Sequence, residues 1–398
     1  MKLNFNTSKS PYIAVLLFGI ISLMGDIVYE GGRGLVPDYL KFLGASAVVV
    51  GLVGGLGEFL GYAVRLISGY LADATRAYWA FMFIGYGLII SIPLLGIASI
   101  WQIAIILVLF ERLGKAFRTP SRDTILSIVS KDIGPGKAFG IHELMDQIGA
   151  IAGPLIVASL MFYSGNNYRS TFLVLLIPFL LLVVVLTSVY RKIGTGMIIE
   201  AEIAREKERK FAKSFYVYTL AVMLNTIGLI PVILILFKAS TILQPLGKQW
   251  IVPLIYLLIQ GVDASVALLS GFAYDKYGIR VLILPFILSI FPPFFAMLDA
   301  ELKTILIAAV FFGIVLGMQE SIYRAAVSEF APVSVRGKAY GIFNVAYGVG
   351  FLISGSIYGL FIDYKVSIML VLFFVIITQT SAITALIRTK PILREEKR

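Results

Sequence analysis

The sequence predicts an all-α membrane protein whose twelve transmembrane helices form two pseudo-symmetric bundles of six. Composition is the first reason, because 59% of the 398 residues are hydrophobic and 14% are charged, whereas soluble domains average about 25% charged residues. An internal repeat is the second reason. GYLAD at 69–73 recurs as GFAYD at 271–275, and GKAFGI at 136–141 recurs as GKAYGI at 337–342, at offsets of 202 and 201 residues. Two motifs that recur in the same order indicate a duplicated half.

Twelve segments are long and apolar enough to cross a bilayer, which takes about 20 apolar residues. They are residues 11–38, 47–72, 77–98, 101–122, 137–163, 170–190, 214–238, 248–272, 279–298, 302–324, 337–362 and 366–388. Segment 191–213, between the sixth and seventh spans, is rich in Lys, Arg and Glu and predicts a cytoplasmic linker. We therefore expect an N-terminal bundle at 1–190 and a C-terminal bundle at 214–398.

The distribution of Lys and Arg predicts that both termini are cytoplasmic. In that orientation, 23 of the 34 Lys and Arg residues lie in cytoplasmic loops and tails, and 6 lie in outer loops. Such an excess of positive charge is typical of the cytoplasmic loops of membrane proteins. The same bias accounts for the net charge of +11, so we expect the lipid bilayer, and not nucleic acid, to be the partner of this charge.

A glycine followed four residues later by an aspartate stands after the second span and again after the eighth. Glycine lets two helices approach closely, and a carboxylate at the membrane edge can lie against the positive N-terminus of a neighbouring helix. The pattern therefore favours a carboxylate that contacts a neighbouring helix, although each aspartate could instead simply end its helix in water. The residues of the two copies are Gly69, Asp73 and Arg76, and Gly271, Asp275 and Arg280.

Six plus six spans, a charged linker and these loop motifs resemble the major facilitator superfamily over nearly the whole chain. The family motif reads approximately G-x-x-x-D-(R/K)-x-G-R-(R/K). The copy that starts at Gly69 lacks the middle glycine and most of the basic tail, and the copy at 271–280 is fuller. The resemblance implies that the aspartates close the cytoplasmic side in the outward-facing state. Asp73 would then meet the start of the eleventh span at 336–341, and Asp275 the start of the fifth span at 136–141.

Span five contains Gly149, Gly153 and Pro154, which are similar to the core of the family's antiporter motif, although the trailing glycine pair is absent. Small residues and proline allow tight packing and kink a helix, so the motif could indicate export or packing alone. The run at 112–123 and the DIVYE string at 26–30 resemble a bacterial and archaeal branch of efflux permeases. That resemblance implies a transport mechanism and leaves the substrate open.

Several ionisable residues fall within the predicted spans, where such groups are costly and usually functional or paired. Asp26, Glu30 and Arg33 share one helical face in span one. Proton coupling needs a buried acid that gains and loses a proton near neutral pH, and a second acid one turn away disfavours double ionisation. The candidates for proton coupling are Asp26, Glu30, Glu58 and Asp146. The alternative is an Asp/Glu–Arg network that holds the first five spans together.

Other polar residues deep in the spans are candidates for lining a substrate cavity. They are Arg33, Arg112, Lys115, Asn225, Gln260, Asp263, Asn344 and Tyr347. The first half therefore holds most of the ionisable chemistry, and the second half presents a more apolar and aromatic surface.

These features predict a secondary transporter of the plasma membrane that exports a small amphipathic compound in exchange for protons and works as a monomer. A proton-coupled symporter that imports a polar solute or an organic anion is the alternative. An enzyme is not expected. The chain has no cysteine, one histidine (His142) and no Walker-type phosphate loop, so we expect no metal, no cofactor and no direct use of ATP.

Overall fold

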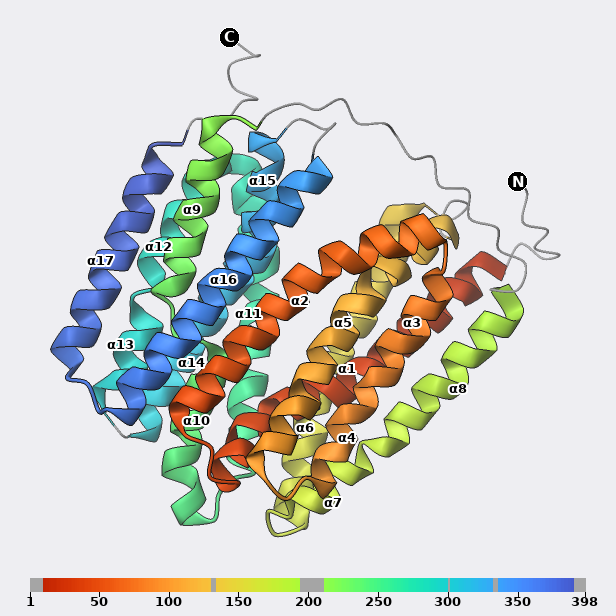
Figure 1. Ribbon diagram of the computed structural model, residues 1–398, viewed down its shortest axis with the longest axis horizontal. Helices are drawn as coiled ribbons and strands as arrows, with labels where there is room; N and C mark the ends of the chain where they lie inside the picture. Colours follow the sequence, from red (N-terminus) through yellow and green to blue (C-terminus); the bar gives the residue numbers. More distant parts are fainter. Residues whose placement is uncertain (1–9, 130–133, 194–210, 300, 332–335, 390–398) are drawn as a thin grey trace. The chain divides into compact units, whose positions relative to one another are not determined.

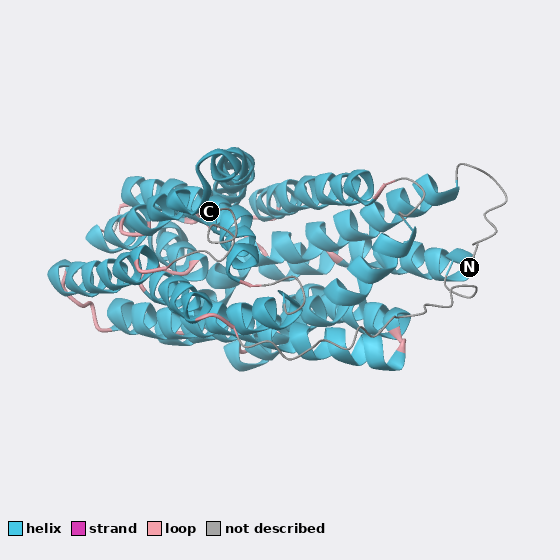
Figure 2. Cartoon of the chain, turned by 90° about the horizontal axis from the view of Figure 1, so that it is seen from above, coloured by secondary structure: helices cyan, strands magenta, loops and turns pink. Residues whose placement is uncertain are grey.

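The computed structural model describes residues 10–129, 134–193, 211–299, 301–331 and 336–389. Within these ranges every regular element is a helix, as Figure 2 shows. The all-α fold class predicted from the sequence is thereby confirmed. The tails and most of the charged linker predicted at 191–213 lie outside the described residues.

Apart from the segment between α8 and α9, the helices follow one another with short connections (Figure 1). Those before the linker are α1 (Ser10–Phe42), α2 (Ala47–Thr75), α3 (Tyr78–Gly87), α4 (Ser91–Leu94), α5 (Trp101–Val129), α6 (Pro135–Tyr163), α7 (Tyr168–Val174) and α8 (Leu176–Ile193). Those after it are α9 (Lys213–Ile227), α10 (Val232–Leu243), α11 (Ile251–Tyr277), α12 (Ile283–Leu288), α13 (Phe291–Leu298), α14 (Leu302–Met318), α15 (Arg324–Phe330), α16 (Arg336–Asp363) and α17 (Ile368–Ile387).

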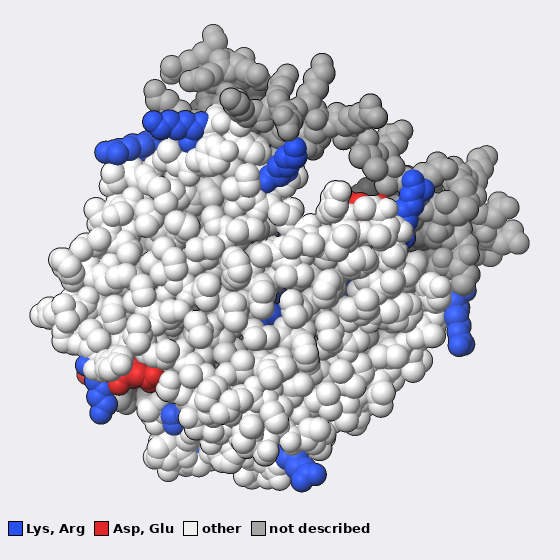
Figure 3. Space-filling model, in the orientation of Figure 1, with Lys and Arg blue, Asp and Glu red and all other residues white. Residues whose placement is uncertain are grey.

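Ten helical segments of the described chain are long and apolar enough to be membrane spans. The sequence predicts twelve spans, and the difference between the two numbers has two causes. The first is α5, which is long enough but carries many charged residues and is not among the ten. The second is the candidate Ile251–Leu298, which contains two predicted spans. The chain turns between them at Gly278, whose φ of 64° favours glycine. The face drawn in Figure 3 is uncharged over most of its area, as contact with lipid requires.

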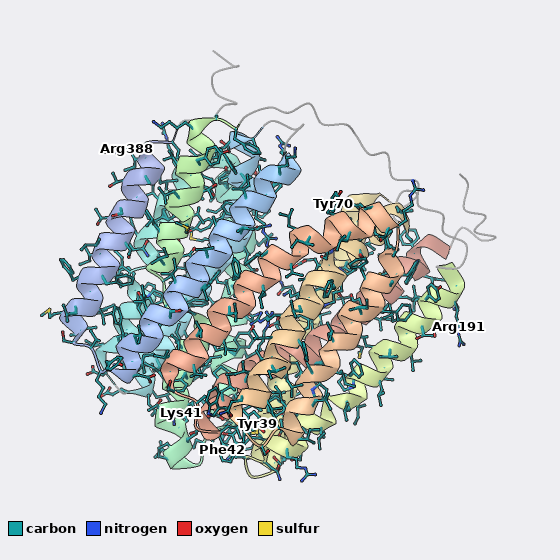
Figure 4. All side chains as sticks on the ribbon, viewed as in Figure 1. Tyr39, Lys41, Phe42, Tyr70, Arg191 and Arg388 are labelled. Carbon is teal, nitrogen blue, oxygen red and sulfur yellow. The ribbon has the colours of Figure 1, made fainter. Side chains whose placement is uncertain are left out.

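The chain divides into two compact units. The first unit comprises residues 1–36 and 64–203, and the second comprises 37–63 and 204–398. The short segment 37–63, the end of α1 and the start of α2, thus precedes the linker in the chain but packs within the second unit. Tyr39, Lys41 and Phe42 lie together at the end of α1 (Figure 4).

Glycines explain how the start of α2 packs so closely on α16. A Cβ atom built on Gly51 would lie 2.1 Å from the carbonyl oxygen of Gly355, so any larger side chain would force the two helices apart. At the end of the same interface, the Asp363 carboxylate accepts hydrogen bonds from the backbone N–H groups of Ala47 and Val48, each at 2.9 Å. Asp363 therefore satisfies two of the donors that a helix N-terminus leaves unpaired.

The predicted seventh span is a broken helix. Helix α9 ends before Gly228 and α10 begins after Pro231, whose ring cannot donate a backbone hydrogen bond. Two side chains of α16 replace the missing helical bonds: the Tyr358 hydroxyl donates to the Gly228 carbonyl at 2.6 Å, and Ser354 donates to the Leu229 carbonyl. Irregular backbone at membrane depth is tolerated where protein groups satisfy it in this way.

Candidate transport site

Ionisable side chains from α1, α5 and α6 gather inside the first unit, and we call this group the first-unit cluster. Its acids are Asp26, Glu30, Glu111, Asp123 and Asp146; its cations are Arg33, Arg112, Lys115, Arg118 and Arg122; His142 joins it from α6. Sequence periodicity had placed the α1 members on one helical face. The structure adds that α5 and α6 supply the partners of that face.

Glu111 is the most deeply buried acid of the cluster, with 1% of its surface exposed. Three guanidinium groups surround its carboxylate: Arg112 Nε at 3.6 Å, Arg118 Nη2 at 3.8 Å and Arg33 Nη2 at 4.0 Å. A buried carboxylate needs such partners, because losing one leaves an uncompensated charge in a medium of low dielectric constant. Glu111 therefore anchors the cations of α1 and α5. Sequence pattern alone did not single out Glu111 as a site residue, although its position near the middle of a span was an available signal.

Arg33 connects the two helices of this part of the cluster. Besides its contact with Glu111, its Nη1 atom lies 2.9 Å from Glu30 Oε1, one turn earlier on α1. The side chains of Arg33 and Arg112 keep 18% and 13% of their surface exposed. Both can therefore be reached in part, and their contact with a substrate stays a prediction.

Arg122 forms a second centre nearer the C-terminal end of α5. It bonds to the adjacent Asp123 at 2.9 Å, donates to Ser22 of α1 at 3.2 Å and lies 3.7 Å from Asp146 of α6. His142 Nδ1 lies 3.4 Å from the same Asp146 carboxylate. Asp146, one of the predicted coupling acids, is thus held by a guanidinium and an imidazole.

Asp26 differs from the other acids of the cluster. It is buried, with 6% of its surface exposed, yet within the described ranges no Lys, Arg or His nitrogen lies within 4.0 Å of its carboxylate. Its polar neighbours are the Tyr29 phenol, Asp146, Glu30 and Lys115. An ionised carboxylate is poorly compensated in such surroundings, because burial and neighbouring acids both disfavour its charge.

The glycines of span five hold Asp26 in this position. A Cβ atom on Gly149 would lie 2.6 Å from Asp26 Cβ, and one on Gly153 would lie 2.7 Å from the Ile27 carbonyl oxygen and 2.8 Å from the Gly31 nitrogen. Helix α6 therefore lies directly on the backbone of α1. Pro154 follows in the same buried stripe. The motif has a packing role in the structure, and its link to export stays a prediction.

Asn225, a predicted cavity residue, is fully buried at the centre of a polar network in the second unit. Its amide nitrogen donates to Gln379 at 2.8 Å and to Ser289 at 3.0 Å, and its amide oxygen accepts from Tyr323 at 2.8 Å and from Gln319 at 3.3 Å. The last two residues belong to a π-helical turn, Gln319–Tyr323, an irregularity that is frequent at functional sites. The network joins α9, α17 and the segments around α12 and α15.

The remaining candidates of the second unit lie at varied depths. Tyr347 is buried, and its hydroxyl donates to Gln319 at 2.9 Å. Asp263 is buried on α11, where that helix packs against α14 at Gly317. Gln260, Asn344 and the predicted coupling acid Glu58 are partly buried. Their roles in binding or coupling stay predictions.

The two predicted gating aspartates, Asp73 and Asp275, are exposed near the ends of α2 and α11. Asp73 accepts a hydrogen bond from the Tyr78 hydroxyl at 2.8 Å within the first unit. Arg76 takes a φ of 56° in the turn after α2. Gly69 faces Pro120 of α5, since a Cβ atom there would lie 3.4 Å from it. The contacts expected between these aspartates and the repeated GKA(F/Y)GI segments, like the roles of Gly271 and Arg280, stay predictions.

Comparison with known families identifies this architecture. The family model described as Major Facilitator Superfamily matches residues 16–354 and 215–398, and the chain belongs to that family. A protein of Mycobacterium bovis is 33% identical over 369 residues, covering 91% of this chain and 90% of its own length. An MFS-type transporter of Methanocaldococcus jannaschii is 27% identical over 352 residues, covering 87% of both chains.

Solved structures of transporters share the fold. A bacterial homologue of the human lysosomal transporter Spinster, in an inward-facing and occupied conformation, superposes with a TM-score of 0.73 at 14% identity, covering 96% of this chain and 98% of its own. The nucleoside transporter NupG gives a TM-score of 0.69 at 14% identity, covering 95% of this chain and 100% of its own. Because the chain belongs to the Major Facilitator Superfamily, it is a multi-pass secondary transporter that works by alternating access, and it is not an enzyme.

Proposed function

We propose that this transporter couples the export of a small amphipathic compound to the entry of protons, and that Asp26 is the acid that carries the proton. One observation supports the choice of Asp26. In the first-unit cluster, Glu30, Glu111, Asp123 and Asp146 each have a cationic nitrogen within 4.0 Å, and Asp26 has none in the described structure. An acid already held by a guanidinium loses its proton readily and keeps its charge, whereas an uncompensated buried acid can change its charge during a cycle.

The charge balance of the cluster suggests how the proton acts. Its five carboxylates and five Lys and Arg side chains are equal in number, so protonation of Asp26 leaves an excess of positive charge. Burying an unbalanced charge costs free energy that depends on conformation. Protonation therefore favours whichever state exposes the cluster to water or to a compensating ligand. A differential stability of this kind is what coupling requires.

Two directions of transport are compatible with such an acid. Export is the direction that we propose, supported by the resemblance of the Gly149, Gly153 and Pro154 stripe to the antiporter motif. Import of an organic anion together with protons is the second candidate. It is favoured by the partly exposed side chains of Arg33 and Arg112, because an anion could bind where protonation leaves positive charge in excess.

Similar structures do not choose between these directions or between substrates. The neighbours include a nucleoside transporter, a peptide transporter and a homologue of Spinster, at identities that establish the fold alone. The plasma membrane, cytoplasmic termini and a monomeric state remain our proposals for this chain. So do two six-helix bundles, at 1–190 and 214–398, that move against each other, with Asp73 and Asp275 as their gates.

Reconstituted liposomes test the proposal. Liposomes that contain the wild-type protein carry a pH-sensitive dye and an imposed pH gradient, and proton movement is recorded on adding ethidium, a small amphipathic cation, or succinate, an organic anion. Antiport predicts opposite movement of protons and ethidium, and symport predicts that protons accompany succinate. Asp26→Asn should abolish gradient-driven flux because the side chain can no longer exchange a proton.

Asp299→Asn is the matched control, since it makes the same chemical change at an exposed acid outside the helices. Its flux should equal that of the wild type. Undiminished gradient-driven flux in Asp26→Asn would move the coupling site elsewhere, first to Glu58 and then to Asp146.

A further inference from the structure

Three cations of the first-unit cluster lie around one aromatic ring, that of Tyr29 on α1. The Arg118 Cζ atom is 4.9 Å from the ring centroid, Lys115 Nζ is 5.0 Å away and Arg33 Cζ is 5.1 Å away. Only 7% of the Tyr29 surface is exposed. The face of an aromatic ring carries partial negative charge and attracts cations most strongly where water is excluded. The ring therefore gathers three like charges without itself carrying a charge.

Tyr29 also lies beside the proposed coupling acid. It follows Asp26 by three residues on the same helix, and its phenol is a polar neighbour of that carboxylate. The charged groups that face Asp26 from the packed helices are Lys115 of α5 and Asp146 of α6, and Glu30 faces it from α1. Lys115 is thus a cation of α5 that faces Asp26, and its ammonium group is held over the Tyr29 ring.

We propose that Tyr29 is a positioning residue that holds Lys115 and Arg118 over its ring and so leaves the Asp26 carboxyl without an ion-pair partner. This inference rests on the proposed function and adds the residue on which the special environment of Asp26 depends. Tyr29 acts through its neighbours and forms no bond to the substrate in this proposal.

Removing the ring should release Lys115 toward the acids. The carboxylates that attract its ammonium are Glu30, Asp26 and Glu111. Glu30 and Glu111 already have guanidinium partners at 2.9 to 4.0 Å, so Asp26 is the acid left for the lysine. Since lysine has a flexible four-carbon stem, its ammonium group can move toward Asp26 once the ring is removed. The resulting ion pair would hold Asp26 in its charged form and oppose proton uptake.

Thermal unfolding of the purified full-length protein, measured from acid to neutral pH, tests the proposal without needing a substrate. Tyr29→Leu removes the ring, Tyr29→Phe keeps it and removes the hydroxyl, and Tyr39→Leu makes the same change at another buried tyrosine of α1. We expect the profile of melting temperature against pH in Tyr29→Leu to move to lower pH by about one unit, since an opposite charge nearby favours the ionised acid. Tyr29→Phe should not move the profile to lower pH, because the ring that holds Lys115 remains.

The controls separate positioning from simple packing. Tyr39→Leu should lower the melting temperature equally at every pH, and adding Tyr29→Leu to Asp26→Asn should produce no further shift. A uniform loss of stability in Tyr29→Leu, or an equal shift in Tyr29→Phe, would overturn the inference. If Tyr29→Leu cannot be purified, Tyr29→Met carries the same expectation. The liposome assay tests the proposed function separately, because undiminished flux in Asp26→Asn would contradict that function. The role of Tyr29 would still be tested by the unfolding measurements.

Discussion

Replacing Gly153 with alanine should destabilise the protein, although alanine is normally the better helix former. The added Cβ would lie 2.7 Å from the Ile27 carbonyl oxygen and 2.8 Å from the Gly31 nitrogen, and both are backbone atoms that cannot rotate away. Reaching an ordinary contact of about 3.4 Å requires α1 and α6 to separate by about 0.7 Å, a gap that forfeits roughly a quarter to a half of the dispersion energy of the atoms involved.

The size of the effect follows from two opposing terms. Overpacking of a close contact costs about 1–3 kcal/mol, and the change from glycine to alanine in a helix returns about 0.5–1 kcal/mol. We expect a net loss of about 1–2 kcal/mol, which for a chain of this length corresponds to a decrease in melting temperature of about 1–3 °C.

Gly140→Ala is the matched control on the same helix. Among the described residues, no atom lies within 4 Å of a Cβ at Gly140, so only the gain in helix propensity remains and the melting temperature should rise. Thermal unfolding of both variants in the same detergent measures the difference in sign. Gly149→Ala with Gly153→Ala should cost less than the sum of the two single changes, because the first alanine already separates the helices. If Gly153→Ala and Gly140→Ala changed the melting temperature in the same direction, the packing described for α1 and α6 would be refuted.

Three further predictions concern other parts of the molecule. Asn225→Ala should cost about 1–3 kcal/mol for each buried polar partner that it leaves unpaired, measured by thermal unfolding against the exposed-site change Thr380→Ala; a loss no larger than in that control would contradict the network. Asp363→Ala should cost about 1 kcal/mol, as for other helix caps, and Asp363→Asn should cost less because one acceptor remains; chemical unfolding of both compares them, and equal losses would argue against capping. Asp73→Asn should shift the ratio of inward- to outward-facing states by about 2- to 5-fold, the effect of one carboxylate at a helix end; spin-label distances measure that ratio, and an unchanged ratio would show that Asp73 only ends its helix.

The sequence by itself determined the features that depend on local pattern. Apolar segments of transmembrane length had to become helices, since backbone groups in lipid must be satisfied within their own segment. The repeat of 69–73 at 271–275 indicated the duplication behind the family fold. Helical spacing placed Asp26, Glu30 and Arg33 on one face, because side chains three and four residues apart lie near each other on a helix.

The tertiary structure decided which of these residues have partners. Spacing along α1 already places Glu30 within reach of Arg33. It cannot show that Asp26 lacks a cation, because the other members of the cluster come from α5 and α6. The burial of Asn225 depends in the same way on Gln379, which lies 154 positions later in the chain. Periodicity determines the face on which a side chain lies. Whether a buried charge or amide is compensated depends on atoms within about 4 Å, and packing brings those atoms from distant parts of the sequence.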